Sequence, residues 1–268
     1  MSTDPVALVT RLRAAGCVFA EDEAALLTDA AGGAALEALV ARRVAGEPLE
    51  QVLGWAAFCG LRIAVAPGVF VPRRRTEFLA SLAAARARAG AVVVDLCCGT
   101  GAVGVAVAAA VPGVRLWAAD VDPAAAACAR RNVGPVGGAV VCGDLFAPLP
   151  DELRGRVGVL VVNAPYVPTG AIALMPPEAR DHEARVALDG GDDGVAVHRR
   201  VAAAAPGWLA PDGVLLVETS EGQAALTAAA MADAGLVPAI HRDEERDATV
   251  VLATRAGRRP GRAAVPAG

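Results

Sequence analysis

The chain has no lysine, few aromatic residues and few histidines; the last two shortages limit the kind of core and of metal site to be expected, whereas the first has no functional meaning. Aromatic residues make up 3% of the chain and hydrophobic residues 55%, so a core of valine, leucine and alanine is expected. The 3 histidines lie far from the 6 cysteines in sequence, and no two cysteines form a C-x-x-C pair. We therefore expect no metal site, and reduced thiols typical of a cytoplasmic protein.

The sequence also shows neither a secretory signal nor a convincing membrane span. Asp4 and Pro5 stand where a basic n-region would be. The uncharged stretch 96–114 contains glycines and a proline, which indicates a strand, a loop and a helix of a soluble domain. The net charge of −4 is unlike that of a general nucleic-acid binder. These features predict a cytoplasmic protein with no membrane partner and no direct nucleic-acid partner.

Residues 1–57 have the apolar spacing of helices and predict a small helical N-terminal domain. Asp4 can cap the first helix because Pro5 suits the first helical position. Gly46 can end the last of these helices, since glycine readily adopts the left-handed conformation found there.

Residues 58–74 predict a β-hairpin linker between this domain and the rest of the chain. Apolar residues alternate over 61–65 and again over 69–71, on either side of a turn at Pro67-Gly68. At the other end of the chain, the composition of residues 257–268 predicts a disordered tail.

Residues 75–256 alternate strand and helix patterns and predict one α/β domain. The predicted strands are Val92–Leu96, Arg115–Asp120, Ala139–Cys142, Val157–Val162 and Val214–Glu218. The predicted helices among them are Ala102–Ala110, Pro123–Asn132 and Gln223–Ala234. Such a pattern indicates a mostly parallel sheet with helices on both faces. Residues 163–191 show little regular pattern, which is typical of an active-site loop.

The first of these strands runs into a glycine-containing turn that is a candidate nucleotide site. Asp95 closes the strand, and the turn then reads Cys97, Cys98, Gly99, Thr100 and Gly101. Glycines there allow positive φ angles and a close approach of ligand to backbone. Ligands of open parallel sheets bind beyond the carboxyl ends of the strands, which is where this turn lies. The spacing of Gly99, Gly101 and Gly104 also fits a dinucleotide fingerprint, so the glycines alone leave a nicotinamide cofactor open.

Acidic residues after the next two strands favour S-adenosylmethionine over a dinucleotide. Asp120 can accept hydrogen bonds from both ribose hydroxyls of a nucleoside. Asp144 can receive an adenine amino group, with Leu145 packed on the ring. Together with Asp95, Cys97, Gly99, Thr100, Gly101 and Asn163, these residues form the expected cofactor site.

The fourth strand ends in Asn163-Ala164-Pro165-Tyr166, which resembles the N-P-P-Y signature of methyltransferases that act on planar nitrogens. An amide nitrogen is a poor nucleophile because its lone pair is delocalised. The Asn163 side-chain oxygen and the Ala164 carbonyl can each accept one N–H, which stabilises the transition state as the nitrogen becomes tetrahedral. Pro165 fixes the backbone, and Tyr166 can lie against the planar group. We expect these residues to be catalytic, mainly through positioning.

Beyond these motifs, the chain resembles the HemK/PrmC family of protein-(glutamine) methyltransferases, which modify the Gly-Gly-Gln motif of class 1 peptide release factors. The resemblance runs from about residue 42 to 253. It is carried by 46–49, 53–54, 58–61, 71–77, Asp95–Gly101, Asp120, Asp144, Asn163–Tyr166, Glu183, 188–191 and Val217-Glu218. It implies a Rossmann-like class I methyltransferase with a seven-stranded sheet, whose last strand, Ala248–Ala253, runs antiparallel. It also implies a helical N-terminal domain that grips the protein substrate.

Three departures from the family pattern lie near the expected binding sites. Cys97-Cys98 stands in place of Gly-Thr, Ala164 in place of proline, and Arg74-Arg75 in place of the Pro-Asp of P-R-P-D-T-E. The acceptor can therefore differ from a release factor. A small-molecule amine or amide, a nucleic-acid amino group and a nucleoside-binding protein without turnover stay open as alternatives.

Overall fold

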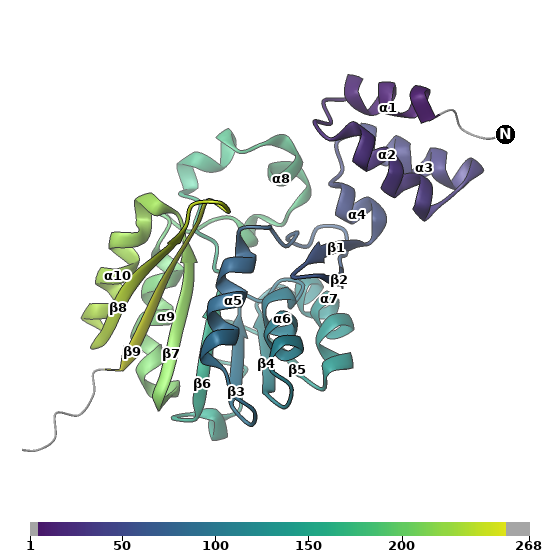
Figure 1. The fold of residues 1–268 in the computed structure, drawn as a ribbon. Coiled ribbons are helices and arrows are strands. Elements are labelled where there is room, and N and C mark those ends of the chain that lie inside the picture. Colours follow the sequence, from purple (N-terminus) through teal and green to yellow (C-terminus); the bar gives the residue numbers. More distant parts are fainter. Residues whose placement is uncertain (1–4, 256–268) are drawn as a thin grey trace, which may run out of the picture.

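The computed structural model describes residues 5–255, which form a small helical part attached to a larger α/β part (Figure 1). The predicted cap Asp4 and the predicted tail 257–268 lie outside the described residues. No helix within the described range is long and apolar enough to cross a membrane.

The N-terminal part consists of helices that enclose a core of their own. These helices are α1 (Pro5–Ala14), α2 (Ala20–Ala30), α3 (Gly33–Val44) and α4 (Leu49–Leu53). Leu8 and Leu12, like Leu36 and Val40, are four residues apart and lie on one face of their helix, where they are buried together with Leu27. This confirms the helical character that the apolar spacing predicts.

A β-hairpin follows, but its predicted position is wrong. Strands β1 (Trp55–Phe58) and β2 (Leu61–Ala64) pair antiparallel, and the turn lies at Cys59-Gly60 instead of Pro67-Gly68. Cys59 and Gly60 both have positive φ angles, 50° and 73°, as the commonest two-residue hairpin turn requires. Gly68 instead bridges Glu183 of the distant loop.

The main sheet has seven strands in the order β5-β4-β3-β6-β7-β9-β8. Their bounds are β3 (Val92–Leu96), β4 (Arg115–Asp120), β5 (Ala139–Cys142), β6 (Val157–Val162), β7 (Leu209–Thr219), β8 (Leu236–Asp243) and β9 (Ala248–Arg255). Strands β3 to β7 run parallel, and β9 runs antiparallel to both β7 and β8. The mostly parallel sheet and its antiparallel last strand are confirmed.

Helices cover both faces of the sheet (Figure 1). Helices α5 (Thr76–Arg86), α6 (Ala102–Ala110) and α7 (Pro123–Val133) share one core cluster with the sheet, which includes Leu79, Val107 and Val133. Helices α9 (Ala196–Trp208) and α10 (Ala224–Asp233) share the other, which includes Trp208 and Met231. Buried on both faces, the central strands are almost continuously apolar.

The site is positioned by the order of the strands. The chain moves outward from β3 to β4 and β5 on one side and to β6 and β7 on the other, so the order reverses at β3. Ligands of such sheets bind at this reversal, beyond the carboxyl ends of the strands. The loop after β6 closes this edge with α8 (Pro177–His182) and two 3-10 turns, Thr169–Leu174 and Arg185–Ala187.

Gln51 of α4 connects the helical part to this loop. Its side chain is 3% exposed, and its Nε2 donates to the carbonyl oxygens of Val69 at 3.1 Å and His182 at 3.2 Å. Its Oε1 accepts from the Gly68 amide at 3.3 Å. One buried side chain therefore ties together α4, the linker and the loop that follows β6.

Candidate active site

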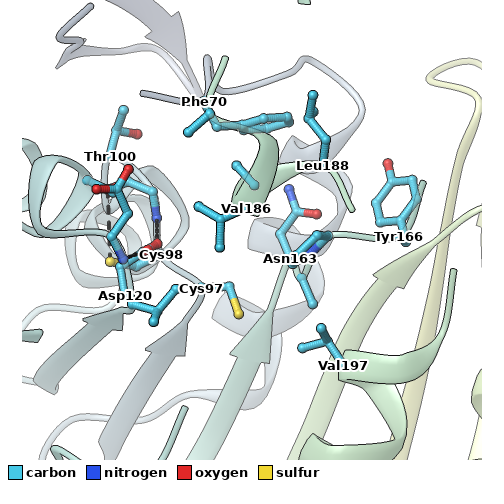
Figure 2. Close-up of a pocket in the computed structure, with 18 of the residues that line it drawn as sticks. Phe70, Cys97, Cys98, Thr100, Asp120, Asn163, Tyr166, Val186, Leu188 and Val197 are labelled. Carbon is cyan, nitrogen blue, oxygen red and sulfur yellow. Dashed lines mark hydrogen bonds between the residues drawn. The ribbon is translucent and has the colours of Figure 1, made fainter. Parts of the chain in front are cut away.

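A cavity of about 610 Å³ opens at the carboxyl ends of β3, β4, β5 and β6. This is a usual size for a small-molecule site. It brings together nearly all the residues that the sequence predicts for cofactor and acceptor, namely Asp95, Cys97, Gly99, Thr100, Asp120, Asp144, Leu145, Asn163, Ala164, Pro165 and Tyr166. Phe70, Val186, Leu188 and Val197 supply apolar walls (Figure 2).

Gly101 does not line the cavity, and its role is to let helix α6 start close to α7. Gly101 caps α6 with a φ of 77°, and a Cβ there would lie 2.7 Å from Val133 Cγ2. At Gly99 (φ 54°) the position of a Cβ is open, with Phe70 Cβ the nearest atom at 4.0 Å. A side chain at 99 would project into the cavity, so the turn offers bare backbone to a ligand.

Cys97 has a φ of 54° in a turn where glycine would be unstrained, and its side chain reaches into the cavity (Figure 2). Burial, reinforced by the charges of Asp120 and Asp95, raises the pKa of its thiol. The group is therefore a neutral wall of the cavity rather than a thiolate nucleophile.

Asp95 links the end of β3 to helix α6, which follows the turn. It is 2% exposed, its Oδ2 accepts from the Gly104 amide at 2.9 Å, and burial raises its pKa to about 8. A Cβ on Gly104 would lie 2.7 Å from Leu116 Cδ1 and 3.1 Å from Asp95 Oδ2. Gly104 therefore serves helix–strand packing and the carboxyl contact, in addition to matching a glycine spacing.

Asp120 is the carboxylate best placed for ribose hydroxyls. Its Oδ2 accepts from the Gly99 amide at 2.8 Å and its Oδ1 from the Asp122 amide at 2.9 Å. These contacts fix the carboxylate beside the glycine turn (Figure 2). Each carboxylate oxygen can accept a second hydrogen bond, so both remain able to receive a vicinal diol.

Asp144 has a partner that the sequence does not predict. Arg200 of α9 forms an ion pair with it, and both line the cavity with about half of each side chain exposed. Leu145, next to it, has a φ of 48°. An amino group arriving at Asp144 would share the carboxylate with the guanidinium of Arg200.

The acceptor loop begins with Asn163, at the end of β6. Its Nδ2 approaches Thr76 Oγ1 of α5 at 3.4 Å, and its Oδ1 lies on the side of Tyr166 (Figure 2). Ala164 is 2% exposed, and no hydrogen bond within residues 5–255 occupies its carbonyl oxygen. The two oxygens that the sequence predicts as acceptors thus belong to adjacent residues of one cavity wall.

Tyr166 is held by a buried acid. Its hydroxyl donates to Glu218 Oε1 at 3.3 Å, and the guanidinium of Arg75 lies 5.8 Å from the centre of its ring. Glu218 is 2% exposed, and its Oε2 has no partner within the described chain. Burial raises the pKa of Tyr166 and that of Glu218. The sequence indicates Glu218 only through the family pattern.

Gln223 is a site residue that sequence reasoning missed. Its Nε2 donates to the Tyr166 carbonyl at 2.8 Å and to the Asp193 carbonyl at 3.0 Å, and its Oε1 accepts from Ser220 at 2.6 Å. The pattern marks Gln223 only as the start of a helix. Its contacts join three segments that are distant in sequence, so no local signal reveals them.

His198 lies behind Tyr166, with the two ring centres 6.5 Å apart. It is 1% exposed, its Nδ1 is 2.9 Å from Thr227 Oγ1, and burial lowers its pKa from 6.5 to about 4. Between these two values the unfolded chain takes up a proton that the folded chain refuses, so stability falls as the pH drops.

We expect the wild-type free energy of unfolding to fall by about 2 kcal/mol more than that of His198→Asn between pH 7 and pH 5. Asparagine keeps a polar partner for Thr227 but cannot titrate. Urea denaturation of both proteins at the two pH values measures the difference. Equal losses in the two proteins would mean that His198 does not resist protonation.

Comparisons with known proteins agree with this geometry. Residues 60–191 match the family described as "Methyltransferase small domain". A release factor glutamine methyltransferase of Geobacter sulfurreducens is 42% identical over 193 residues, which cover 71% of this chain and 67% of that protein. A 4-amino-L-phenylalanine/4-methylamino-L-phenylalanine methyltransferase of Streptomyces pristinaespiralis is 40% identical over 193 residues, which cover 69% of this chain and 65% of that one.

Among solved structures, a ribosomal protein L11 methylase from Lactobacillus delbrueckii subsp. bulgaricus superposes with a TM-score of 0.52 at 17% identity. The superposition covers 72% of this chain and 84% of that chain. This likeness concerns the fold alone.

Proposed function

This chain belongs to the family of release factor glutamine methyltransferases, and we propose that it transfers a methyl group from S-adenosylmethionine to the side-chain amide nitrogen of a protein glutamine. We further propose a peptide chain release factor as the protein substrate. The observation that supports the proposal is that Asn163 and Ala164, whose carbonyl oxygen has no hydrogen bond within residues 5–255, line the same cavity as Asp120 and Gly99.

The cavity suits the methyl donor. Asp120 can receive the ribose hydroxyls, the bare backbone at Gly99 admits the amino-acid portion, and Asp144 with Leu145 can hold the adenine. When bound, S-adenosylmethionine supplies an electrophilic methyl group on a sulfonium, which leaves as a neutral thioether once its S–C bond breaks.

The acceptor loop meets the chemical demand of an amide nucleophile. Asn163 and the Ala164 carbonyl each accept one N–H of the amide, which turns its lone pair toward the methyl carbon as the N–C bond forms. The nitrogen becomes acidic after methylation, and its proton passes to solvent without a strong base. Glu218 does not serve as that base in this scheme, because it is buried behind Tyr166 and receives the tyrosine hydroxyl. Tyr166 and Pro165 confine the planar group.

A second candidate is the methylation of an aromatic primary amine on a small molecule. The 40% identity to the Streptomyces pristinaespiralis enzyme supports it, since that protein's name gives an arylamine as its substrate. Such an amine is also a planar NH₂ group with a delocalised lone pair, so the same two acceptor oxygens suit it.

The deciding experiment incubates the purified chain with methyl-labelled S-adenosylmethionine and a recombinant class 1 release factor. The matched control is the same release factor with the glutamine of its Gly-Gly-Gln motif changed to alanine. We expect label in the first factor only, and peptide mass spectrometry should place one methyl group on that glutamine. A parallel incubation contains 4-amino-L-phenylalanine in place of the factor. Label on this compound but on neither factor would replace this proposal with the second candidate.

A further inference from the structure

The arginine run that departs from the family pattern, Arg73–Arg75, lies between the linker and α5 at the acceptor end of the cavity. Arg73 and Arg75 line the cavity, whereas Arg74 does not. The side chain of Arg74 is 77% exposed and stands 3.7 Å from Glu245, which is equally exposed. The three neighbours therefore divide into two cavity arginines and one surface arginine.

The positive charge of Arg73 is balanced by a buried carboxylate, that of Glu183. Its guanidinium donates to Glu183 at 2.6 Å and lies 5.0 Å from the centre of the Phe70 ring. Glu183 also accepts from the Val71 amide at 3.0 Å and has a fully buried side chain. A short charged hydrogen bond to a buried acid makes Arg73 part of the framework.

Arg75 is held much less tightly. Its closest carboxylate is Glu218 at 3.6 Å, which is beyond hydrogen-bond length, and 43% of its side chain is exposed. A guanidinium has five N–H donors in a planar fork that matches a carboxylate. Within residues 5–255 no hydrogen bond of ordinary length takes up these donors, which lie beside the Tyr166 ring and next in sequence to Thr76, which contacts Asn163.

The two ends of the cavity differ in charge. The cofactor end carries the carboxylates of Asp120, Asp122 and Asp144, of which only Asp144 forms an ion pair within residues 5–255, with Arg200. Arg75 stands at the end where Tyr166 and Asn163 receive the acceptor, with the buried Glu218 3.6 Å away. Figure 2 shows Asp120 and Tyr166 on opposite sides, with Asn163 between them. An anionic group on the acceptor is therefore repelled from the first end and attracted to the second.

We propose that the acceptor carries a carboxylate close to the methylated nitrogen, and that Arg75 binds it as a specificity-determining residue. The inference rests on the proposed methyl transfer and adds the charge of its acceptor. On a protein substrate the carboxylate belongs to an aspartate or glutamate beside the glutamine, and on a small molecule to the acceptor itself.

The test compares kcat/KM for methylation of the motif glutamine or of the ring amine, located by mass spectrometry, in matched acceptors that carry or lack this charge. One pair is a Gly-Gly-Gln peptide followed by aspartate or by asparagine, and a second pair carries the same exchange before the motif. An arylamine pair, 4-aminophenylacetate and 4-aminophenylacetamide, covers the second candidate function. We expect the wild type to prefer the anionic member of the pair that it methylates by roughly 10- to 100-fold. Arg75→Ala should bring that ratio close to one.

Arg74→Ala is the matched control, since it removes the same charge one residue away but outside the cavity. It should keep the wild-type ratio. Each ratio is taken within one preparation, so it does not depend on the folded fraction. If Arg75→Ala does not fold because Glu218 loses its counter-charge, Arg75→Ala/Glu218→Gln replaces it. Equal use of both members by the wild type, or an unchanged ratio in Arg75→Ala, would overturn the inference. If only the arylamines are methylated, the proposed function fails and their ratio still decides the inference.

Discussion

Asn163→Ala is expected to lower kcat by roughly 100- to 1,000-fold while leaving the Kd for S-adenosylmethionine within a few-fold of wild type. The side-chain oxygen of Asn163 would meet the amide N–H most strongly as the N–C bond forms. Its loss therefore affects the transition state more than the ground state. In the proposed binding mode the methyl donor contacts mainly the β3 turn and Asp120, which this substitution does not touch.

Single-turnover transfer of labelled methyl measures the first quantity, and isothermal titration measures the second. Asn163→Asp is the companion variant, because it keeps an acceptor oxygen but loses the NH₂ group that faces Thr76. Its rate should lie between those of wild type and Asn163→Ala. A rate for Asn163→Ala near that of wild type would remove the two-oxygen arrangement from the mechanism. A matching loss of cofactor affinity would reassign Asn163 to binding.

The sequence predicts the central strands and the edge where ligands bind, because both depend on local signals. Val92–Leu96 is a short apolar run interrupted only by Asp95, and Val157–Val162 is one that Asn163 follows; the structure has them as β3 and β6 with the same bounds. Parallel strands present their carboxyl ends at one edge, so the sequence alone is enough to place Asp120 and Asn163 near the same cavity.

The errors and omissions come from contacts between distant segments. The alternation over 61–71 fits a hairpin about Pro67-Gly68, but pairing across Cys59-Gly60 and the contact of Gly68 with the later loop decide the outcome. Strand β8 also escapes prediction, since Pro238 lies within it and argues against a strand; an edge strand tolerates that proline.

The site shows the same division between local and distant signals. A sequence motif identifies Asn163, Pro165 and Tyr166, whereas no motif identifies the side chains that hold them in place. Gln223 reaches the Tyr166 carbonyl across 57 residues, and Glu218 reaches its hydroxyl across 52. Residue type and spacing thus identify the groups that meet the ligand. Only the fold reveals the supporting side chains, here Gln223 and Glu218, which fix the orientation of those groups.

Gly194→Ala tests directly whether the contact between Gln223 and the Tyr166 carbonyl supports the acceptor loop. Gly194 has a φ of 76°, and a Cβ there would lie 2.0 Å from Gln223 Nε2 and 2.4 Å from the Tyr166 carbonyl oxygen. The added methyl group must displace the Gln223 side chain, the backbone of the acceptor loop, or both. We expect the free energy of unfolding to fall by about 2–4 kcal/mol, from backbone strain and overpacking together. The melting temperature should fall by about 5–10 °C.

Gly222→Ala is the matched control, since it adds the same methyl group beside Gln223 at a position with no heavy atom within 4 Å. Its melting temperature and kcat should stay near wild type. Because the Tyr166 carbonyl follows Asn163 by three residues, the acceptor oxygens should shift in Gly194→Ala, and kcat should fall more than cofactor affinity does. The chain has 1 tyrosine, so the one set of tyrosine ring resonances in the NMR spectrum reports whether Tyr166 has moved. A Gly194→Ala protein with unchanged melting, turnover and tyrosine signal would mean that Gln223 does not clamp the acceptor loop, and that Asn163 is oriented by β6 and Thr76 alone.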